Sequence, residues 1–239
     1  MSRISIFNIP LFYISKERQQ SIEDMYKKHG FTNVNHFQAV NGRNLDPVKL
    51  FMDKVISARA YNEISSKARK EWWGVSGLGA VGCALSHYSL WRLCVDKGWD
   101  FITITEDDNS FIAPIDEAKI QKVLAASPKS VYYGIKPQDI GFGTHFYIIS
   151  RDLCAVLIEY FFPIDLQVDS YAAWVSNIIK GVSIGGDNIT QQKRSGPQSS
   201  IQNFCIPCVL PSSNGFYIIL AAIIIVVLSG AVVSFFALS

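Results

Sequence analysis

The chain divides at Arg194 into a charged part and an uncharged part. None of residues 195–239 is Asp, Glu, Lys or Arg, whereas globular proteins contain about a quarter charged residues. Within this tail, residues 216–238 (FYIILAAIIIVVLSGAVVSFFAL) contain no charge and no proline, and as a helix they are long enough to cross a hydrocarbon core of about 30 Å. A buried core helix or strand is the alternative, but core helices of this length nearly always carry a polar face. The pattern therefore predicts a transmembrane helix.

The remainder of the chain is expected to form one folded domain over residues 1–194. Residues 195–215 are rich in Ser, Gln, Asn and Pro, a composition that cannot build a core and predicts a flexible tether. A span at the extreme C-terminus can insert only after translation ends. We therefore expect a single-pass membrane protein with a C-terminal anchor and its folded domain on the cytosolic side.

Charge and cysteine content narrow the function. The net charge of +2, without a basic cluster in the sequence, gives no support to nucleic-acid binding. Cys83, Cys94 and Cys154 lie in apolar segments and are expected to be core thiols. Cys205 and Cys208 form a single C-x-x-C pair, and no second pair completes a zinc site, so juxtamembrane acylation is as plausible as metal binding there.

Strand and helix patterns alternate through the charged part of the chain. The segment SKERQQSIEDMYKKHGF predicts a helix that Ser15 caps and Gly30 ends, between the strand-like runs ISIFNIPLFYI and VNHFQAV. Residues 48–73 are expected to hold one or two helices. The glycine-rich run GVSGLGAVG lacks the spacing of a phosphate-binding loop and is expected to be a flexible connector. This alternation predicts an α/β fold.

A further predicted helix, from Ala80 to a stop at Gly98, leads into the apolar strand WDFITIT and then into Glu106, Asp107 and Asp108. Adjacent carboxylates repel one another unless a positive group lies among them, and open α/β sheets bind ligands where their strands end. In an extended chain Glu106 and Asp108 share one face, so the pair suits Mg²⁺ or Mn²⁺ bound together with a diphosphate. A plain exposed loop is the alternative.

The segment GAVGCALSHYSLWRLCVDKGWDFITITEDD, residues 79–108, closely resembles the central block of glycosyltransferase family 25. That block carries a Gly-x-x-Gly-Cys-x-x-Ser-His-x-x-x-Trp helix and then a strand ending in Glu-Asp-Asp. Two flanking segments, HFQAVNGRNL and GTHFYIISRDLCAVLIEYFFPIDLQVDSY, are similar to the family's early Phe-x-Ala-x-x-Gly turn and its later Val-Asp region. The resemblance covers about residues 10–174 and does not extend to the apolar tail.

The resemblance implies a GT-A type fold, a nucleotide-sugar-binding α/β sheet flanked by helices. It also implies transfer of a hexose, often galactose from UDP-galactose, with inversion, to a hydroxyl of a glycan or protein. Family relatives act on lipopolysaccharide or on collagen, and the sequence does not choose between such acceptors. A divalent metal, Mn²⁺ or Mg²⁺, would stabilise the departing diphosphate, and a carboxylate would deprotonate the acceptor hydroxyl.

Particular residues take these roles by resemblance. Asp169, in LQVDSY, is the candidate catalytic base, and a helix N-cap is its alternative role. The candidate metal ligands are Asp108, Glu106 and His145. The candidate donor-binding residues are Arg18, Ser86, His87, Glu106 and Asp107. Ser86 and His87 could equally be hydrogen-bonded polar residues of the core, and His145 a satisfied strand histidine.

The chain also departs from the family pattern. The segment FYISKER lacks the Asn-Leu that usually ends the family's first strand, and Gln167 replaces the common Pro before the later Val-Asp. Two alternatives to a transferase therefore stay open. One is a membrane protein that keeps the fold and binds without catalysis, and the other is a metal-dependent nucleotide-sugar hydrolase.

Overall fold

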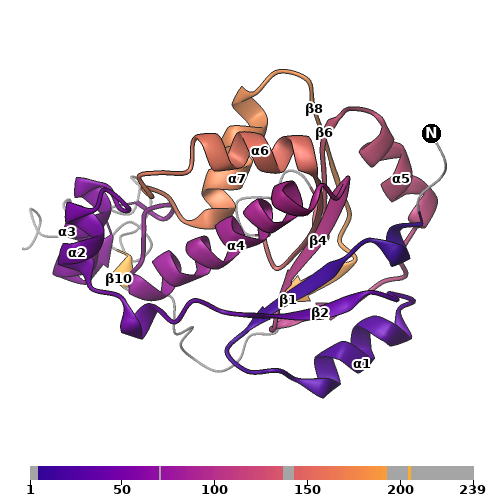
Figure 1. Cartoon of the computed structure of the whole chain (residues 1–239), viewed down its shortest axis with the longest axis horizontal. Coiled ribbons are helices and arrows are strands. Elements are labelled where there is room, and N and C mark those ends of the chain that lie inside the picture. The colour runs from indigo at the N-terminus through magenta and orange to yellow at the C-terminus, as the bar shows by residue number, and fades with distance from the viewer. Residues whose placement is uncertain (1–4, 70, 137–142, 193–203, 206–239) are drawn as a thin grey trace, which may run out of the picture.

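A six-stranded mixed β-sheet forms the centre of the protein (Figure 1). The computed structural model describes residues 5–69, 71–136, 143–192 and 204–205. The strands of this sheet are β1 (Leu11–Ser15), β2 (Val34–Gln38), β4 (Phe101–Glu106), β6 (Lys129–Tyr133), β7 (Phe146–Ser150) and β8 (Val182–Gly186). They lie in the order β2-β1-β4-β7-β6-β8. Strands β2, β1 and β4 are parallel, β7 is antiparallel to both of its neighbours, and β6 is parallel to β8.

Helices cover both faces of the sheet, which confirms the predicted α/β class (Figure 1). They are α1 (Gln20–Lys28), α2 (Pro47–Met52), α3 (Ala58–Ser66), α4 (Leu78–Lys97), α5 (Glu117–Ala125), α6 (Arg151–Glu159) and α7 (Val168–Ile178), with the 3-10 turns η1 (Ile6–Asn8) and η2 (Gly42–Asn44). Residues of α3, α4, α6 and α7 pack into one hydrophobic core, and residues of α1 and α5 pack into a second. The sheet lies between the two cores.

Side-chain alternation along the strands supplies both cores. On β6, Tyr132 packs on the side of α1 and α5, while Tyr133 packs on the side of α4 and α6. On β1, Tyr13 and Ile14 divide in the same way. Successive residues of a strand point to opposite faces, so a strand buried on both faces is expected to be mostly apolar or aromatic.

Most of the predicted elements agree with the structure, but the first helix begins later than expected. Helix α1 starts at Gln20, and Ser15 is the last residue of β1, where its Oγ donates to the backbone oxygen of Glu17. Ser15 is therefore not the helix cap. The stop signals were read correctly: Gly30 and Gly98 have φ of 94° and 67°, left-handed values that glycine adopts at little cost.

The glycine-rich segment is not the flexible connector that we expected. Its second half already belongs to α4, and there the glycines allow two pieces of backbone to approach closely. A Cβ on Gly82 would lie 2.4 Å from the carbonyl oxygen of Val40, and a Cβ on Gly42 would lie 2.3 Å from that of Leu78. The spacing of these glycines serves the packing of η2 against α4.

The predicted membrane topology requires a correction. Within the described residues, no helix combines the length and the apolar character needed to cross a bilayer. The longest of them, α4, carries Arg92, Asp96 and Lys97 in its last turns, and such charges oppose insertion. Residues 216–238, where the span was predicted, lie outside the described residues. The single-pass localisation with a C-terminal anchor is therefore withdrawn.

Two small sheets complete the described structure. Strand β5 (Asn109–Phe111) pairs antiparallel with β9 (Thr190–Gln192), so the end of the 143–192 segment lies beside the acidic residues that follow β4. Strand β3 (Ala68–Arg69) pairs parallel with β10 (Phe204–Cys205), two residues of the predicted tether. The division into residues 1–194, 195–215 and 216–238 stays a prediction.

Candidate active site

The acidic residues lie at the carboxyl edge of the three parallel strands. Glu106 is the last residue of β4, and β1 pairs with β4 so that Ile14 lies opposite Glu106. Asp107 and Asp108 form the turn between β4 and β5. The chain before β7 crosses the same edge, where the backbone oxygen of His145 accepts from the Glu106 backbone amide at 3.0 Å. Sequence-distant segments therefore meet where the sequence analysis predicted a ligand site.

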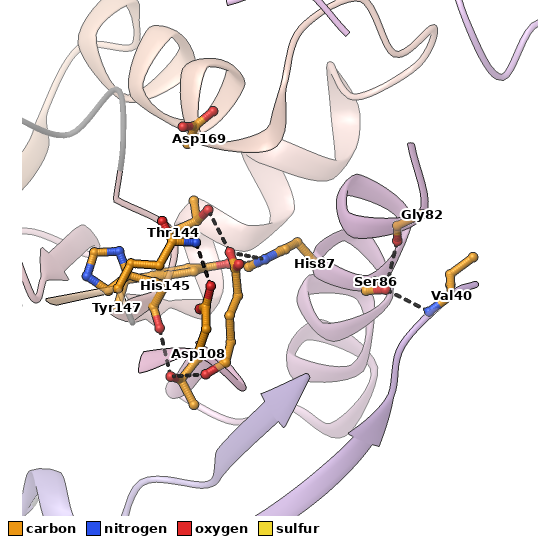
Figure 2. Close-up of polar contacts among 12 residues, drawn as sticks. Val40, Gly82, Ser86, His87, Asp108, Thr144, His145, Tyr147 and Asp169 are labelled. Carbon is orange, nitrogen blue, oxygen red and sulfur yellow. Dashed lines mark hydrogen bonds and ion pairs between the residues drawn. The ribbon is translucent and has the colours of Figure 1, made fainter. Parts of the chain in front are cut away.

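Glu106 faces inward rather than toward the turn. Its Oε1 accepts from Thr144 Oγ1 at 3.2 Å and lies 3.4 Å from Nε2 of His87 (Figure 2). Burial raises the pKa of this carboxyl, but the neighbouring His87 and His145 and the hydrogen bond from Thr144 outweigh burial and leave the pKa lowered. Glu106 is therefore held as a carboxylate beneath the site.

Asp108 has the opposite electrostatic setting. Burial and the charge of Glu106 raise its pKa to about 6, although Gln192 Nε2 donates to its Oδ2 at 2.7 Å. Its Oδ1 is buried and accepts no hydrogen bond from the described residues. Asp107 is exposed as a whole residue. Partial burial of its carboxyl group, and then the charge of Glu106, raise the pKa of Asp107 as well. A buried carboxylate oxygen without a donor, among repelling acids, fits a bound cation.

Asp169 lies in the first turn of α7, above the acidic turn (Figure 2). The helix N-cap is Gln167, so the alternative reading of Asp169 as the cap is wrong. Its Oδ1 accepts from the backbone amide of its own neighbour Ser170 at 2.7 Å. Burial, and then the charge of Glu106, raise its pKa to about 6, which brings it near the neutral range that suits a general base.

The two polar residues of α4 are buried rather than exposed to the site edge. Ser86 Oγ donates to the Gly82 carbonyl at 2.8 Å and accepts from the Val40 amide at 2.9 Å (Figure 2). His87 Nδ1 lies 2.9 Å from the hydroxyl of Tyr147. Both side chains are 0% exposed. This geometry supports the core reading that the sequence left open for them.

Two further predicted site residues, His145 and Arg18, differ in their exposure. His145 is buried and its Nε2 lies 3.1 Å from Thr190 Oγ1, so that nitrogen already has a protein partner. Arg18 follows β1 at the same sheet edge and is 70% exposed, but its guanidinium pairs with the buried Glu23 at 2.6 Å. The assigned roles of both residues stay predictions.

Four residues of this site were missed from the sequence. Cys83, one turn before His87 on α4, brings its sulfur close to His87 and Glu106, and the three ligand atoms lie within 4.8 Å of one another. Thr144 and Gln192 bind the acids, and Tyr147 binds His87. The i, i+4 spacing of Cys83 and His87 was a readable signal for a shared helix face. No local sequence pattern indicated a role for Thr144, Gln192 or Tyr147.

Comparison with known proteins decides the family. The sequence model described as glycosyltransferase family 25 (LPS biosynthesis protein) matches residues 6–122. A "Glycosyltransferase 25 family member" of Drosophila melanogaster is 27% identical over 142 residues, which are 56% of this chain and 22% of that protein. Its namesake in Drosophila pseudoobscura pseudoobscura is 28% identical over 119 residues, 50% of this chain and 18% of that protein.

Residues 6–122 of the chain belong to glycosyltransferase family 25. The predicted family is thus confirmed. The family 25 match includes Arg18, Ser86, His87 and the acidic turn, and it ends before His145, Asp169 and Gln192. The chain spans only about a fifth of the length of these two curated relatives.

Proposed function

We propose that this family 25 chain transfers a hexose, galactose in the first instance, from a nucleotide-diphosphate sugar to a hydroxyl of a glycan or protein, with inversion. The sheet and its flanking helices would then serve as a GT-A type nucleotide-sugar-binding domain. One observation carries the proposal. Glu106, Asp108 and Asp169, from β4, the following turn and α7, interact electrostatically at one sheet edge, and two of them have raised pKa values.

A divalent metal, Mn²⁺ or Mg²⁺, fits the acidic turn because Oδ1 of Asp108 is buried without a donor from the described residues. Asp108 would hold the ion with Glu106, and His145 is the further candidate ligand. When bound, such an ion neutralises charge on the oxygens of the departing diphosphate. Gln192 orients Asp108 through the 2.7 Å hydrogen bond to Oδ2 and so leaves Oδ1 for the ligand.

Asp169 would accept the proton of the attacking acceptor hydroxyl. Its raised pKa, about 6, keeps it ionised at neutral pH while making it a stronger base than an exposed aspartate. The backbone amide of Ser170 fixes one of its oxygens, which leaves the other for the acceptor. An inverting reaction needs its base on the face opposite the leaving group, and α7 is separate from the turn that carries Asp108.

The remaining predicted donor contacts divide into two groups. Arg18 and Asp107 are exposed at the same sheet edge, and we keep them as candidate contacts of the donor. Ser86 uses both its donor and its acceptor capacity on backbone groups, so we assign it to the fold rather than to the donor. A nucleotide sugar and a hydroxyl-bearing acceptor are the proposed partners.

The test is incubation of the full chain with a panel of nucleotide sugars, Mn²⁺ and a mixture of glycan and peptide acceptors. Transfer that Asp108→Asn abolishes, and that the exposed control Asp96→Asn retains, would support the proposal. Release of nucleotide without acceptor modification would instead identify a hydrolase. Donor binding without either reaction would identify a binding protein.

A further inference from the structure

A buried carboxylate of α1 holds an exposed arginine. Glu23, in the first turn of α1, is only 2% exposed. Its Oε1 accepts from Arg18 Nε at 2.6 Å, and its Oε2 accepts from Arg18 Nη2 at 3.1 Å. The buried hydroxyl of Tyr13 also donates to Oε1, at 3.1 Å. A carboxylate is buried at reasonable cost only with such partners, so the burial of Glu23 and the orientation of Arg18 depend on each other.

The loop that carries Arg18, residues 16–19 between β1 and α1, is held by its backbone as well. The backbone amide of Gln19 donates to the Tyr13 hydroxyl at 3.1 Å, and Gln38 of β2 donates to the backbone oxygen of Lys16. One buried hydroxyl therefore joins this loop to the carboxylate that holds its arginine.

Pairing with Glu23 uses only one edge of the guanidinium. Arginine has five N–H donors in a planar fork, and Glu23 takes one from Nε and one from Nη2. Glu23 thus leaves both donors of Nη1 and the second donor of Nη2. Nη1 and Nη2 together form the end of the fork, where two N–H groups match two oxygens of a phosphate. The Arg18 side chain is 70% exposed, so a ligand can reach this end.

The arginine loop lies at the same sheet edge as the acidic turn. Strands β1 and β4 are parallel and pair with Ile14 opposite Glu106, so the two strands end side by side. Burial and the charge of Glu106 raise the pKa of Asp107, and the charge of Lys16 opposes them. Exposed cations of one loop therefore stand beside the acids of the next, an arrangement that suits an anion carrying its own metal ion.

We infer that Glu23 is a positioning residue that presents the outer end of the Arg18 guanidinium to the phosphate oxygens of a nucleotide diphosphate. The choice of ligand rests on the proposed function. Glu23 itself does not touch the nucleotide. An unrestrained arginine loses side-chain freedom when it binds a ligand, whereas Arg18 has already lost it to Glu23. Such preorganisation strengthens binding without adding a contact.

Charge alone predicts the opposite effect of Glu23. A carboxylate near a bound phosphate repels it and also competes with it for the guanidinium, so removal of this charge should strengthen anion binding. Glu23→Gln keeps the size of the side chain but turns an NH₂ group toward the arginine donors, and the two-point contact is lost. The sign of the change in affinity therefore separates positioning from charge.

The test is calorimetric titration of the full chain with UDP and with uridine at a fixed Mn²⁺ concentration. Arg18→Gln should weaken UDP binding about 10- to 100-fold, as expected for loss of a charge-assisted hydrogen bond, and Glu23→Gln should weaken it about 10-fold. Uridine has no phosphate, so its affinity should be the same in both variants and the wild type. The double variant should bind UDP no more weakly than Arg18→Gln, because Glu23 acts only through Arg18.

Glu17→Gln is the matched control for charge. Glu17 is an exposed residue of the same loop, and the change removes the same charge without touching the pair of Arg18 and Glu23. UDP binding should be unchanged or slightly stronger. Weakening equal to that of Glu23→Gln would show that the loop, and not the position of Arg18, is sensitive to substitution, and would overturn the inference.

Tyr13→Phe tests the same network without changing any charge. It removes the hydroxyl that bonds Glu23 and Gln19 and should weaken UDP binding about 5-fold, the value of one neutral hydrogen bond. Tyr132→Phe is its control, because the equally buried Tyr132 donates to Asp187, away from this loop. Urea unfolding shows whether each variant is folded, and Tyr13→Phe decides the test if Glu23→Gln is not.

Unchanged or stronger UDP binding by Glu23→Gln, additive effects in the double variant, or no UDP binding by the wild type would each overturn the inference. Turnover is read separately: Glu23→Gln should raise the KM for the donor and keep kcat. A wild-type chain that binds UDP through Arg18 and Glu23 but transfers no sugar would refute the proposed function alone. Sugar transfer with equal UDP affinity in all variants would refute this inference alone.

Discussion

Gly82 of α4 and Val40, after β2, touch through their backbones, and a Cβ on Gly82 would lie 2.4 Å from the Val40 carbonyl oxygen. Real Cβ atoms do not approach a backbone oxygen so closely. The absence of a side chain at this position therefore sets how near α4 lies to the chain that follows β2.

The first prediction is that Gly82→Ala destabilises the protein by about 1–3 kcal/mol, the usual cost of overpacking. In a helix without the close contact, the same change should stabilise by about 1 kcal/mol, because alanine is the better helix former. The sign of the change in the free energy of unfolding, measured in urea, therefore shows whether the close contact or the helix propensity dominates. A stabilised variant would mean that the contact with Val40 is loose.

Ser86→Ala separates a role in the fold from a role in donor binding. The change leaves the Val40 amide without its 2.9 Å acceptor, so we expect a loss of about 1–3 kcal/mol in unfolding free energy. The affinity for the nucleotide sugar should not change. Calorimetric titration of the donor, at a temperature where the variant is fully folded, provides the check. Weaker donor binding at unchanged stability would restore the donor contact predicted from the sequence.

Asp169→Asn should make the protein more stable at neutral pH while making it inactive. Folding raises the pKa of this carboxyl to about 6 from about 3.9 in the unfolded chain. Its stabilising contribution is thus complete below about pH 4 and is lost as the pH rises through 6. Asparagine keeps the oxygen that accepts from Ser170 and carries no charge to bury.

We expect a gain of about 2 kcal/mol at pH 8 and no gain at pH 4, measured by urea unfolding at both values. Donor affinity should be kept, and transfer should fall at least 100-fold, as for loss of a general base. The exposed control Asp96→Asn should change neither quantity. Wild-type transfer by Asp169→Asn would place the base elsewhere.

Binding of UDP should depend on Mn²⁺ through Asp108. The carboxylates of the turn leave coordination positions for the diphosphate to fill, so each ligand should strengthen binding of the other. Calorimetry of UDP with and without Mn²⁺ on the wild type and Asp108→Asn gives the four affinities required. If all four are equal, the metal has no part in nucleotide binding.

Gln192→Ala should weaken Mn²⁺-dependent UDP binding about 10-fold, because the hydrogen bond from Gln192 to Asp108 orients a metal ligand from outside. The neighbouring exposed residue Gln191 offers the matched control Gln191→Ala, since its backbone oxygen accepts from Ser110 of β5 and the substitution keeps that contact. The two variants should differ in UDP affinity only when Mn²⁺ is present. A difference in its absence would indicate a direct contact between Gln192 and the nucleotide.

Much of the architecture was accessible from local patterns. The stop at Gly98, the apolar run of β4 and the acids that follow it were all visible in the sequence, because helix and strand periodicity and glycine conformation are local properties. The start of α1 was not, because Ser15 continues β1 and bonds to Glu17 instead of capping. A serine that precedes a helical pattern can either cap the helix or belong to the preceding strand.

By itself, the sequence determined the alternating α/β plan, the family 25 motif and the position of Glu106 to Asp108 at the end of a strand. Only the tertiary structure decided how each acid behaves, because burial and distant partners set its charge. His87 and Thr144 hold Glu106 ionised and turned inward, while burial and repulsion raise the pKa of Asp108 and Asp169. His87, Thr144 and Asp169 lie on α4, before β7 and on α7. Electrostatic interactions depend on distances in space, and a linear pattern does not contain those distances.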